Sequence, residues 1–293
     1  MTFIAPSRTQ TALREAPRIS NLFLRLYTLV RDDREKKEWK HIEYAAMEAA
    51  LSTTDEIAVL RQLAERQRRL AAALAPLRVR LLRMKLHDSD LTSGLSSPTL
   101  LENGMTLLRP YGIPIVAGSA VKGIAASWLA ELLEGRFNLT GGQRTAALER
   151  AGALVLFGEA CGEDGLPGKA VFFDALPCPT QQMIAADNTT VHYPAWYQAH
   201  DAPSGFENPV PIPFLTVNRG TVFQFCFAVK EDSSLDVRLN AAQDQTLSGY
   251  GIPERTDTMA FLEQLLVSAA QYKGFGSQTA VGYGRMEPEG AAR

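Results

Sequence analysis

The sequence predicts an α+β fold in which an antiparallel sheet is covered by two helices on one face. Three observations lead to this prediction. Segments with the two-residue period of strands begin at Leu77 and recur almost to the end of the chain. Two long segments between them have the 3.6-residue period of helices. With insertions set aside, the order of elements is β-α-β-β-α-β, which is that of the ferredoxin-like arrangement.

Residues 1–76 are predicted to be a helical extension in front of this domain. Residues 55–75 have apolar side chains at helical spacing, and Pro76 marks the end of the helix. The stretch 19–51 is also predicted to be helical, although its middle is highly charged. The domain itself is therefore expected to span residues 77–293.

The first expected strand changes phase near its middle. Leu77, Val79 and Leu81 alternate with arginines, and Leu82 and Met84 then carry the apolar face. This slip predicts a bulge or a strand boundary between residues 81 and 82.

A basic stretch overlaps this strand. From Arg61 to Lys85 there are eight basic residues and one acidic residue, Glu65. Two interpretations remain open: a solvated face of a helix and a strand, which we favour for any single arginine, and contact with RNA.

The later elements follow in the order that the fold requires. They are a polar loop at 87–104, a helix from Ser119 to Gly135, a strand at 168–177, an insertion at 178–215, a strand at 220–229, a helix at 256–271 and a strand at 280–286.

Composition limits the classes of protein and of site. Of the 293 residues, 46% are hydrophobic and 21% are charged, which is typical of soluble globular domains. We expect no membrane contact, because no apolar run reaches the ~20 residues that cross a bilayer. Cys161, Cys178 and Cys226 form no C-x-x-C pair, so we expect a cytoplasmic protein without disulfides, metal or cofactor. The net charge of −2 means that any nucleic-acid contact must come from local patches.

The start of the helix at residue 119 is a candidate anion site. Ser119 is a good N-cap residue, and the free N–H groups of a first turn attract phosphate. Lys122 is unfavourable there unless an anion docks, because the helix dipole disfavours a cation. Gly118, Ser119 and Lys122 are therefore candidate RNA contacts; the alternative is that Lys122 is a surface lysine in water.

The segment "YKGFGSQTAVGYGRM" is a second candidate. Its glycines do not match a dinucleotide or Walker fingerprint. Glycine permits positive φ and lets another backbone come close, which suits a sugar-phosphate chain. The alternative is a glycine-rich turn that closes the sheet. The candidate RNA contacts are Lys273, Gly274, Gly276, Ser277, Gln278 and Thr279.

The insertion carries aromatic residues that are candidates for base stacking. His192, Tyr193 and Trp196 could stack on unpaired bases. We favour the alternative, in which they form a small satellite core.

Several of these motifs together resemble those of a known family. They are "YGIPIVAGSAVKGIAA", "LFGEA", "GKAVFFDALP", "HYPAWYQ" with "ENPVPIPFLTV", and "GFGSQTAVGYG". In this order, over residues 77–286, they resemble the RAMP superfamily of CRISPR proteins. Within it they are similar to the subunit-six family of the type III-B Cmr complex. The chain differs at Gln278, where that family usually has lysine.

The resemblance implies an RRM-like ferredoxin domain and a role without catalysis. The subunit would hold the spacer part of a guide RNA, and this guide base-pairs with target RNA. It would also cap a filament of related Cmr-type subunits. Some RAMP relatives cut target RNA with an aspartate in the loop after the first strand, where this chain has Asp88 and Asp90 beside His87. An endoribonuclease is therefore the alternative; a nucleotide-dependent enzyme has no supporting phosphate-loop motif.

Overall fold

The computed structural model describes most of the chain beyond residue 55 and a few residues before it. The described residues are 2–3, 21, 23–24, 31–32, 56–94, 105–158, 167–180, 183–193, 196, 202, 208, 210–230, 239–252 and 257–290. The chain divides into two compact units. The first comprises Met1–Ile57, Thr92–Pro114 and Thr180–Asn218, and the second comprises Ala58–Leu91, Ile115–Pro179 and Arg219–Arg293. The division into 1–76 and 77–293 follows different boundaries and stays a prediction.

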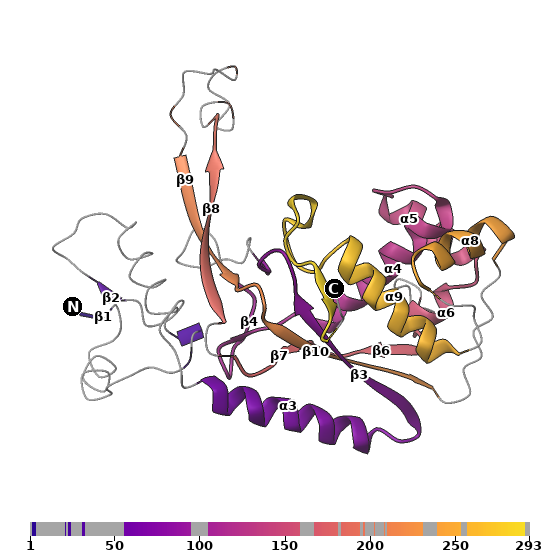
Figure 1. Ribbon diagram of the computed structural model, residues 1–293, viewed down its shortest axis with the longest axis horizontal. Coiled ribbons are helices and arrows are strands. Elements are labelled where there is room, and N and C mark those ends of the chain that lie inside the picture. The colour runs from indigo at the N-terminus through magenta and orange to yellow at the C-terminus, as the bar shows by residue number, and fades with distance from the viewer. Residues whose placement is uncertain are drawn as a thin grey trace. The chain divides into compact units, whose positions relative to one another are not determined.

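The second unit is built on an antiparallel sheet with the strand order β11-β3-β10-β6, in which β7 also pairs with β10 (Figure 1). The strands are β3 (Leu77–Leu86), β6 (Ala170–Phe172), β7 (Leu176–Pro177), β10 (Val222–Lys230) and β11 (Met286–Pro288). Helix α4 (Gly118–Glu134) lies between β3 and β6 in the chain, and α9 (Thr258–Tyr272) lies between β10 and β11. The predicted β-α-β-β-α-β order is therefore present, with the strand at 168–177 broken into β6 and β7.

Burial along β3 changes phase between Leu81 and Leu82, as the sequence indicates. The predicted bulge or boundary is wrong, because the pairing with β10 continues without interruption through Leu81↔Cys226 and Leu82↔Phe225. Successive residues of a strand face opposite sides of a sheet. The phase changes because both faces of this strand are covered, each over a different part of its length.

Helices α4 and α9 cover one face of the sheet. Arg80 on β3 makes an ion pair with Glu263 on α9 at 2.8 Å. The ring of Phe225 on β10 packs against Phe275, just after α9, with ring centroids 5.0 Å apart. Both helices lie where the apolar periodicity predicts them, and α4 ends at Gly135 in the left-handed conformation.

Helix α3 (Glu56–Ala73) covers the opposite face, and it confirms the helix predicted at 55–75. Leu60 and Leu63 are buried. Gln67 accepts a hydrogen bond from Gln224 Nε2 at 2.8 Å and donates to the carbonyl oxygen of Asp174 at 3.1 Å. The sheet therefore has helices on both faces, whereas the sequence predicts them on one.

The described part of the second unit also contains the shorter helices α5 (Gly141–Arg150), α6 (Leu154–Phe157) and α8 (Ala241–Gly249). Helices α5 and α8 each begin with a capping box, in which the N-cap side chain and a glutamine side chain bond each other's backbone N–H groups.

The described residues of the first unit form three two-stranded ribbons. The longest pairs β8 (Ile184–Val191) with β9 (Val210–Val217), so the described part of the predicted insertion is mainly an antiparallel ribbon. The second pairs β4 (Leu107–Leu108) with β5 (Ile113–Pro114).

The third ribbon pairs β1 (Thr2–Phe3) with β2 (Arg31–Asp32). The helix predicted over 19–51 is therefore wrong at residues 31–32, because pairing with β1 supplies their backbone hydrogen bonds. Most of the rest of that stretch lies outside the described residues. Among the helices that the structure describes, none is both long and apolar enough to span a bilayer.

Candidate nucleic-acid interface

The glycine-rich segment forms a loop that follows α9 and closes on itself. The N–H of Phe275 donates to the carbonyl oxygen of Gly284 at 2.9 Å, and the Phe275 side chain is fully buried. Thr279–Val281 forms a short 3-10 turn, η2, at the other end of the loop. The loop thus has a buried base and a partly exposed tip, which we define as residues 276–279.

The strand predicted at 280–286 is wrong except at Met286, where β11 begins. Gly282 and Gly284 have φ values of 104° and 73°, which no extended strand allows. The strand can therefore start only after the last of these glycines.

The two glycines at the loop base serve the fold. A Cβ on Gly274 would lie 2.8 Å from the carbonyl oxygen of Tyr283, and one on Gly284 would lie 1.9 Å from that of Phe275. Both glycines are buried. RNA contact at Gly274 stays a prediction, and in the structure its missing side chain makes room for the chain's own backbone.

The loop tip keeps the features that the sequence predicts. Gly276 is exposed, and Ser277, Gln278 and Thr279 are half-buried. Gln278 has a φ of 56°, which is uncommon for a residue with a side chain. This backbone turn brings the peptide groups of the tip to the surface, where a sugar-phosphate chain can reach them.

Lys273 does not present a free charge. Its Nζ donates to Ser127 Oγ at 2.9 Å and to Glu131 Oε1 at 2.7 Å, both on α4. Glu131 is only 2% exposed. Contact between Lys273 and phosphate stays a prediction, and in the structure its ammonium group compensates a buried carboxylate.

The start of α4 also differs from the prediction. The helix begins at Gly118 after the N-cap residue Ala117, so Ser119 is not the cap. The buried N–H of Gly118 donates to Asp174 Oδ1 at 2.8 Å. An acidic side chain at a helix N-terminus is favourable, and this one takes the place expected for a phosphate at Gly118. RNA contact at Gly118 stays a prediction, and in the structure its N–H group already has a partner.

Two members of this predicted site stay accessible. Ser119 is exposed and Lys122 is half-buried on the first turns of α4. Lys122 precedes Ser127, the partner of Lys273, by five residues, or about 7.5 Å of helix. The glycine-rich segment, through Lys273, thus contacts the helix that carries the other candidate site.

The acidic loop after β3 packs against the glycine-rich loop. The N–H of Gly284 donates to the carbonyl oxygen of Asp90 at 2.8 Å, and Ser89 Oγ donates to the carbonyl oxygen of Gly282. Asp90 Oδ1 accepts the N–H of Arg219 at 2.8 Å. The sequence did not identify Ser89, Arg219 or Asp174 as neighbours of these loops, because their partners are far away in the chain.

Asp88 is the exposed acid of this loop. Its Oδ1 lies 2.8 Å from His87 Nδ1, and its side chain is 80% exposed. The other ring nitrogen of His87 lies 3.5 Å from Glu287 Oε2. Across the described ranges, no three His, Cys, Asp or Glu side chains come together in a way that could hold a metal ion.

The aromatic candidates of the insertion lie in the first unit. His192, Tyr193 and Trp196 are all exposed, with Tyr193 at 41% and Trp196 at 55%. The satellite core that we favoured for them is therefore wrong. They remain candidates for stacking.

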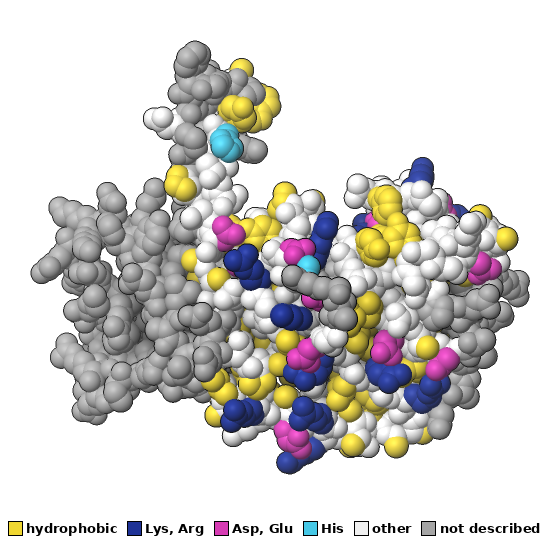
Figure 2. All heavy atoms as spheres, in the orientation of Figure 1, with side chains coloured by type: hydrophobic (Ala, Val, Ile, Leu, Met, Phe, Trp, Pro, Cys, Tyr) yellow, Lys and Arg dark blue, Asp and Glu magenta, His cyan; other side chains and the backbone are white. Residues whose placement is uncertain are grey.

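The basic stretch from Arg61 to Lys85 is partly neutralised. On β3, Arg78 pairs with Asp257 at 3.0 Å and Arg83 pairs with Glu289 at 2.9 Å, as Arg80 does with Glu263. The hydrogen bond from Arg78 lowers the pKa of Asp257. Figure 2 shows these mixed charges as basic side chains with acidic ones beside them. The strand arginines therefore fit the solvated-face interpretation.

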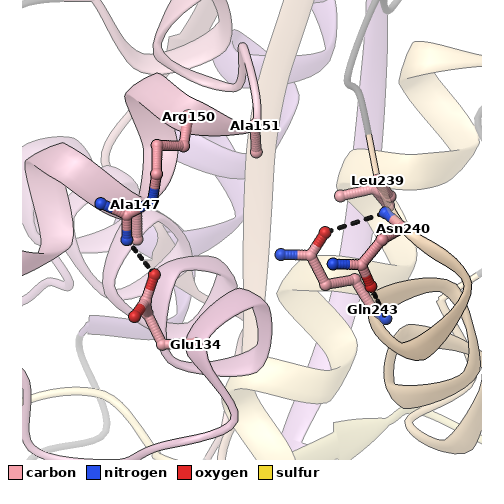
Figure 3. A pocket seen from close by; sticks show the side chains of 7 residues that line it. All are labelled: Glu134, Ala147, Arg150, Ala151, Leu239, Asn240 and Gln243. Atoms are coloured by element: carbon pink, nitrogen blue, oxygen red, sulfur yellow. Dashed lines mark hydrogen bonds and ion pairs between the residues drawn. The ribbon is translucent and has the colours of Figure 1, made fainter.

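A cavity of about 370 Å³ lies between α4, α5 and α8 (Figure 3). On one side Glu134 forms an ion pair with Arg150, and on the other Asn240 and Gln243 form the capping box of α8. Gln243 Nε2 also donates to the carbonyl oxygen of Leu133 at 3.0 Å. These polar groups bond one another, and none of the predicted site residues lines the cavity.

Two of the three cysteines are described, and both are free and buried. Burial raises the pKa of the Cys226 thiol to about 11 and also raises the pKa of Cys178. These thiols are therefore unreactive at neutral pH. Cys161 lies outside the described residues.

Comparisons with known proteins give consistent results. A family model described as the RAMP superfamily matches residues 73–287. The CRISPR system Cmr subunit Cmr6 of Pyrococcus furiosus is 25% identical over 245 residues, which are 68% of this chain and 65% of that relative. A chain in the cryo-EM structure of the type III-B Cmr-beta complex bound to cognate target RNA has a TM-score of 0.53 at 18% identity, covering 89% of this chain and 77% of that one. The crystal structure of Cmr6 from Pyrococcus furiosus has a TM-score of 0.38 at 23% identity, covering 74% and 99%.

Proposed function

This chain belongs to the RAMP superfamily, and from that premise we propose that it is a non-catalytic, RNA-binding subunit of a type III-B CRISPR complex. Its partners are the guide RNA, the complementary target RNA and other Cmr-type subunits of a cytoplasmic hetero-oligomer. It holds the spacer part of the guide and caps the backbone filament in antiviral defence. The observation that carries the proposal is the family match, which includes both α4 and the glycine-rich loop.

The second unit is, in this proposal, a ferredoxin-like domain that binds RNA through loops and not through its sheet. The strand order and the placement of α4 and α9 support this description. In RRM domains, bases stack on aromatic side chains of an open sheet face. In this chain α3 covers the corresponding face, since Gln67 on α3 is hydrogen-bonded to Gln224 on β10. RNA contact is therefore expected at the loops beside α4.

We assign the backbone contacts to the loop tip and to the exposed first turns of α4. Peptide groups of Gly276, Ser277, Gln278 and Thr279, with Ser119 and Lys122, would contact phosphate and sugar. Such contacts position a strand without reading its bases. Sequence specificity then comes from base pairing between guide and target.

Changing Lys122 and Gln278 to glutamate is expected to reduce retention of guide RNA, because each change adds a negative charge beside a phosphate. With several phosphate contacts, retention falls further as salt rises. The measurement is the guide RNA that co-purifies with the tagged, full-length chain at increasing salt. Lys169→Glu, a half-buried lysine beside α6, is the matched charge control. Equal retention by all three variants would mean that these segments do not bind the guide.

The endoribonuclease alternative has weaker support in the geometry. The Asp90 carboxylate already accepts a backbone N–H, and Asp88 pairs with His87 at the surface. We therefore expect the assembled complex with Asp88→Ala and Asp90→Ala to cleave target RNA at the parental rate. The measurement is single-turnover cleavage of labelled target. A rate reduced by a hundredfold or more, with guide content unchanged, would instead identify this chain as the nuclease.

The remaining part of the proposal concerns residues 1–76. Its helix α3 covers the sheet of the second unit, and we propose that the part before α3 packs against a neighbouring subunit of the complex.

A further inference from the structure

An aromatic cluster on the second unit has no role in the function proposed so far. Trp128 on α4 stacks against Phe137, with ring centroids 6.0 Å apart, and against Tyr272, at 5.7 Å. The angles between the ring planes are 18° and 10°. Tyr250 meets both Trp128 and Tyr272 edge-on. Trp128 lies in α4 and Phe137 follows the end of that helix. Tyr250 caps the end of α8, and Tyr272 is the last residue of α9.

The two outer rings are open to solvent. Trp128 is 2% exposed, whereas Phe137 is 60% and Tyr272 is 53% exposed. Stacking on Trp128 uses one face of each outer ring, and Tyr250 also contacts Tyr272, yet more than half of each outer residue stays exposed. Figure 2 shows a group of hydrophobic side chains on the surface near the place of α5 in Figure 1. Exposed large apolar groups that lie together mark an interaction site.

The rings are held in place before any partner arrives. Trp128 Nε1 donates to Ser268 Oγ at 2.9 Å, which ties α4 to α9. Phe137 follows a left-handed C-cap at Gly135, where the N–H of Arg136 donates back to the carbonyl oxygen of Glu131. The capping box at Thr140 begins α5 three residues later. The two outer rings are therefore held in fixed positions.

The charges around the rings suit a polyanion. Both carboxylates of α4 are neutralised, Glu131 by Lys273 and Glu134 by Arg150. The exposed Arg136 immediately precedes Phe137. Phosphate groups would meet a neutral to positive surface here, although the whole chain has a net charge of −2.

We propose that Phe137 and Tyr272 form a stacking platform for unpaired bases of RNA. This inference rests on the proposed function and extends it to a second part of the surface. Tyr272 directly precedes Lys273 and the glycine-rich loop, so this ring lies beside the base of the loop whose tip we assign to backbone contacts. Aromatic stacking accepts any base, because every base has a flat π face. The platform therefore suits a guide whose sequence varies.

The direct test is photocrosslinking of the full-length chain to a single-stranded RNA that carries 5-iodouridine. A base stacked on a ring crosslinks to that ring, and the modified residue is identified by mass spectrometry. We expect crosslinks at Phe137 or Tyr272. Crosslinks confined to other residues would overturn the proposal, and this test needs no variant that could fail to fold.

A second test separates bases from phosphates. Phe137→Ala and Tyr272→Ala are expected to weaken binding of a uridine oligonucleotide by about tenfold each. Binding of an abasic oligonucleotide of the same length should be unchanged, because it keeps the phosphates and lacks the bases. Phe137→Trp and Tyr272→Phe keep an aromatic ring and should bind like the parent. Leu70→Ala, an exposed apolar control on α3, should have no effect.

The outcomes distinguish this proposal from the function on which it rests. If the parent chain binds the oligonucleotide and the alanine variants bind it equally well, the platform does not stack bases, and the rings face a protein subunit instead. If the loop-tip variants lose both oligonucleotides while the ring variants lose neither, the RNA-binding function stands and the platform fails. If the parent binds neither oligonucleotide and retains no guide, both fail.

Discussion

Replacing Lys273 by methionine is expected to lower the free energy of unfolding by about 3–5 kcal/mol. The Lys273 ammonium lies 2.7 Å from the carboxylate of Glu131, which is 2% exposed. Without the lysine, that carboxylate stays buried without a compensating charge. The measurement is urea denaturation of the full-length chain, followed by circular dichroism.

The double variant Lys273→Met with Glu131→Met should recover most of this loss. Replacing both members of a buried ion pair by apolar groups is often neutral, because no buried charge remains. Lys169→Met is the matched control, and it should change stability by less than about 0.5 kcal/mol. A double variant as unstable as Lys273→Met alone would contradict the ion-pair explanation.

The same variant separates a structural lysine from an RNA-binding one. If Lys273 contacted phosphate, its loss would reduce the salt dependence of guide binding by about one unit of slope. We expect the slope to stay the same, since the ammonium group is already bonded to Ser127 and Glu131. A stable Lys273→Met protein with a reduced slope would reverse our assignment.

Two glycines of α4 are expected to respond to alanine with opposite signs. A Cβ on Gly118 would lie 2.4 Å from the carbonyl oxygen of Phe172, so Gly118→Ala should destabilise the fold by about 2–3 kcal/mol. A Cβ on Gly123 would meet no atom within 4 Å. Gly123→Ala should therefore stabilise the helix by about 0.5–1 kcal/mol, since alanine is the better helix former.

Thermal unfolding of the two variants and the parent checks this prediction. The clash at Gly118 is with backbone atoms at the end of β6, which cannot move without disturbing the sheet and the bond between Gly118 and Asp174. Equal melting temperatures for Gly118→Ala and the parent would mean that the start of α4 is free enough to receive a phosphate, as the sequence alone indicated.

The main helices and strands could be predicted from the sequence because apolar periodicity is a local property. The apolar stripe around Trp128 and Leu129 predicted α4, and the phenylalanines of β10 alternate as a strand requires. The order of these elements then predicted the sheet. The resemblance to the RAMP superfamily was also present in short motifs, which the family match confirms.

The roles of single polar residues depended on partners from distant parts of the chain. Lys273 and Gly118 looked like ligands for an anion until the structure placed Glu131 and Asp174 against them. The phase slip in β3 looked like a bulge because only the fold shows that α3 covers the second face. The exposed rings of Phe137 and Tyr272 lie 135 residues apart in sequence, and only packing on Trp128 brings them together.

The sequence by itself determined where the main elements of the domain (β3, α4, β10 and α9) form, their order, and the family to which the chain belongs, because these depend on neighbouring residues and short motifs. Only the tertiary structure decided which charges are already paired, which glycines make room for the protein's own backbone and which aromatic rings face solvent. These properties depend on atoms that are close in space and distant in the chain.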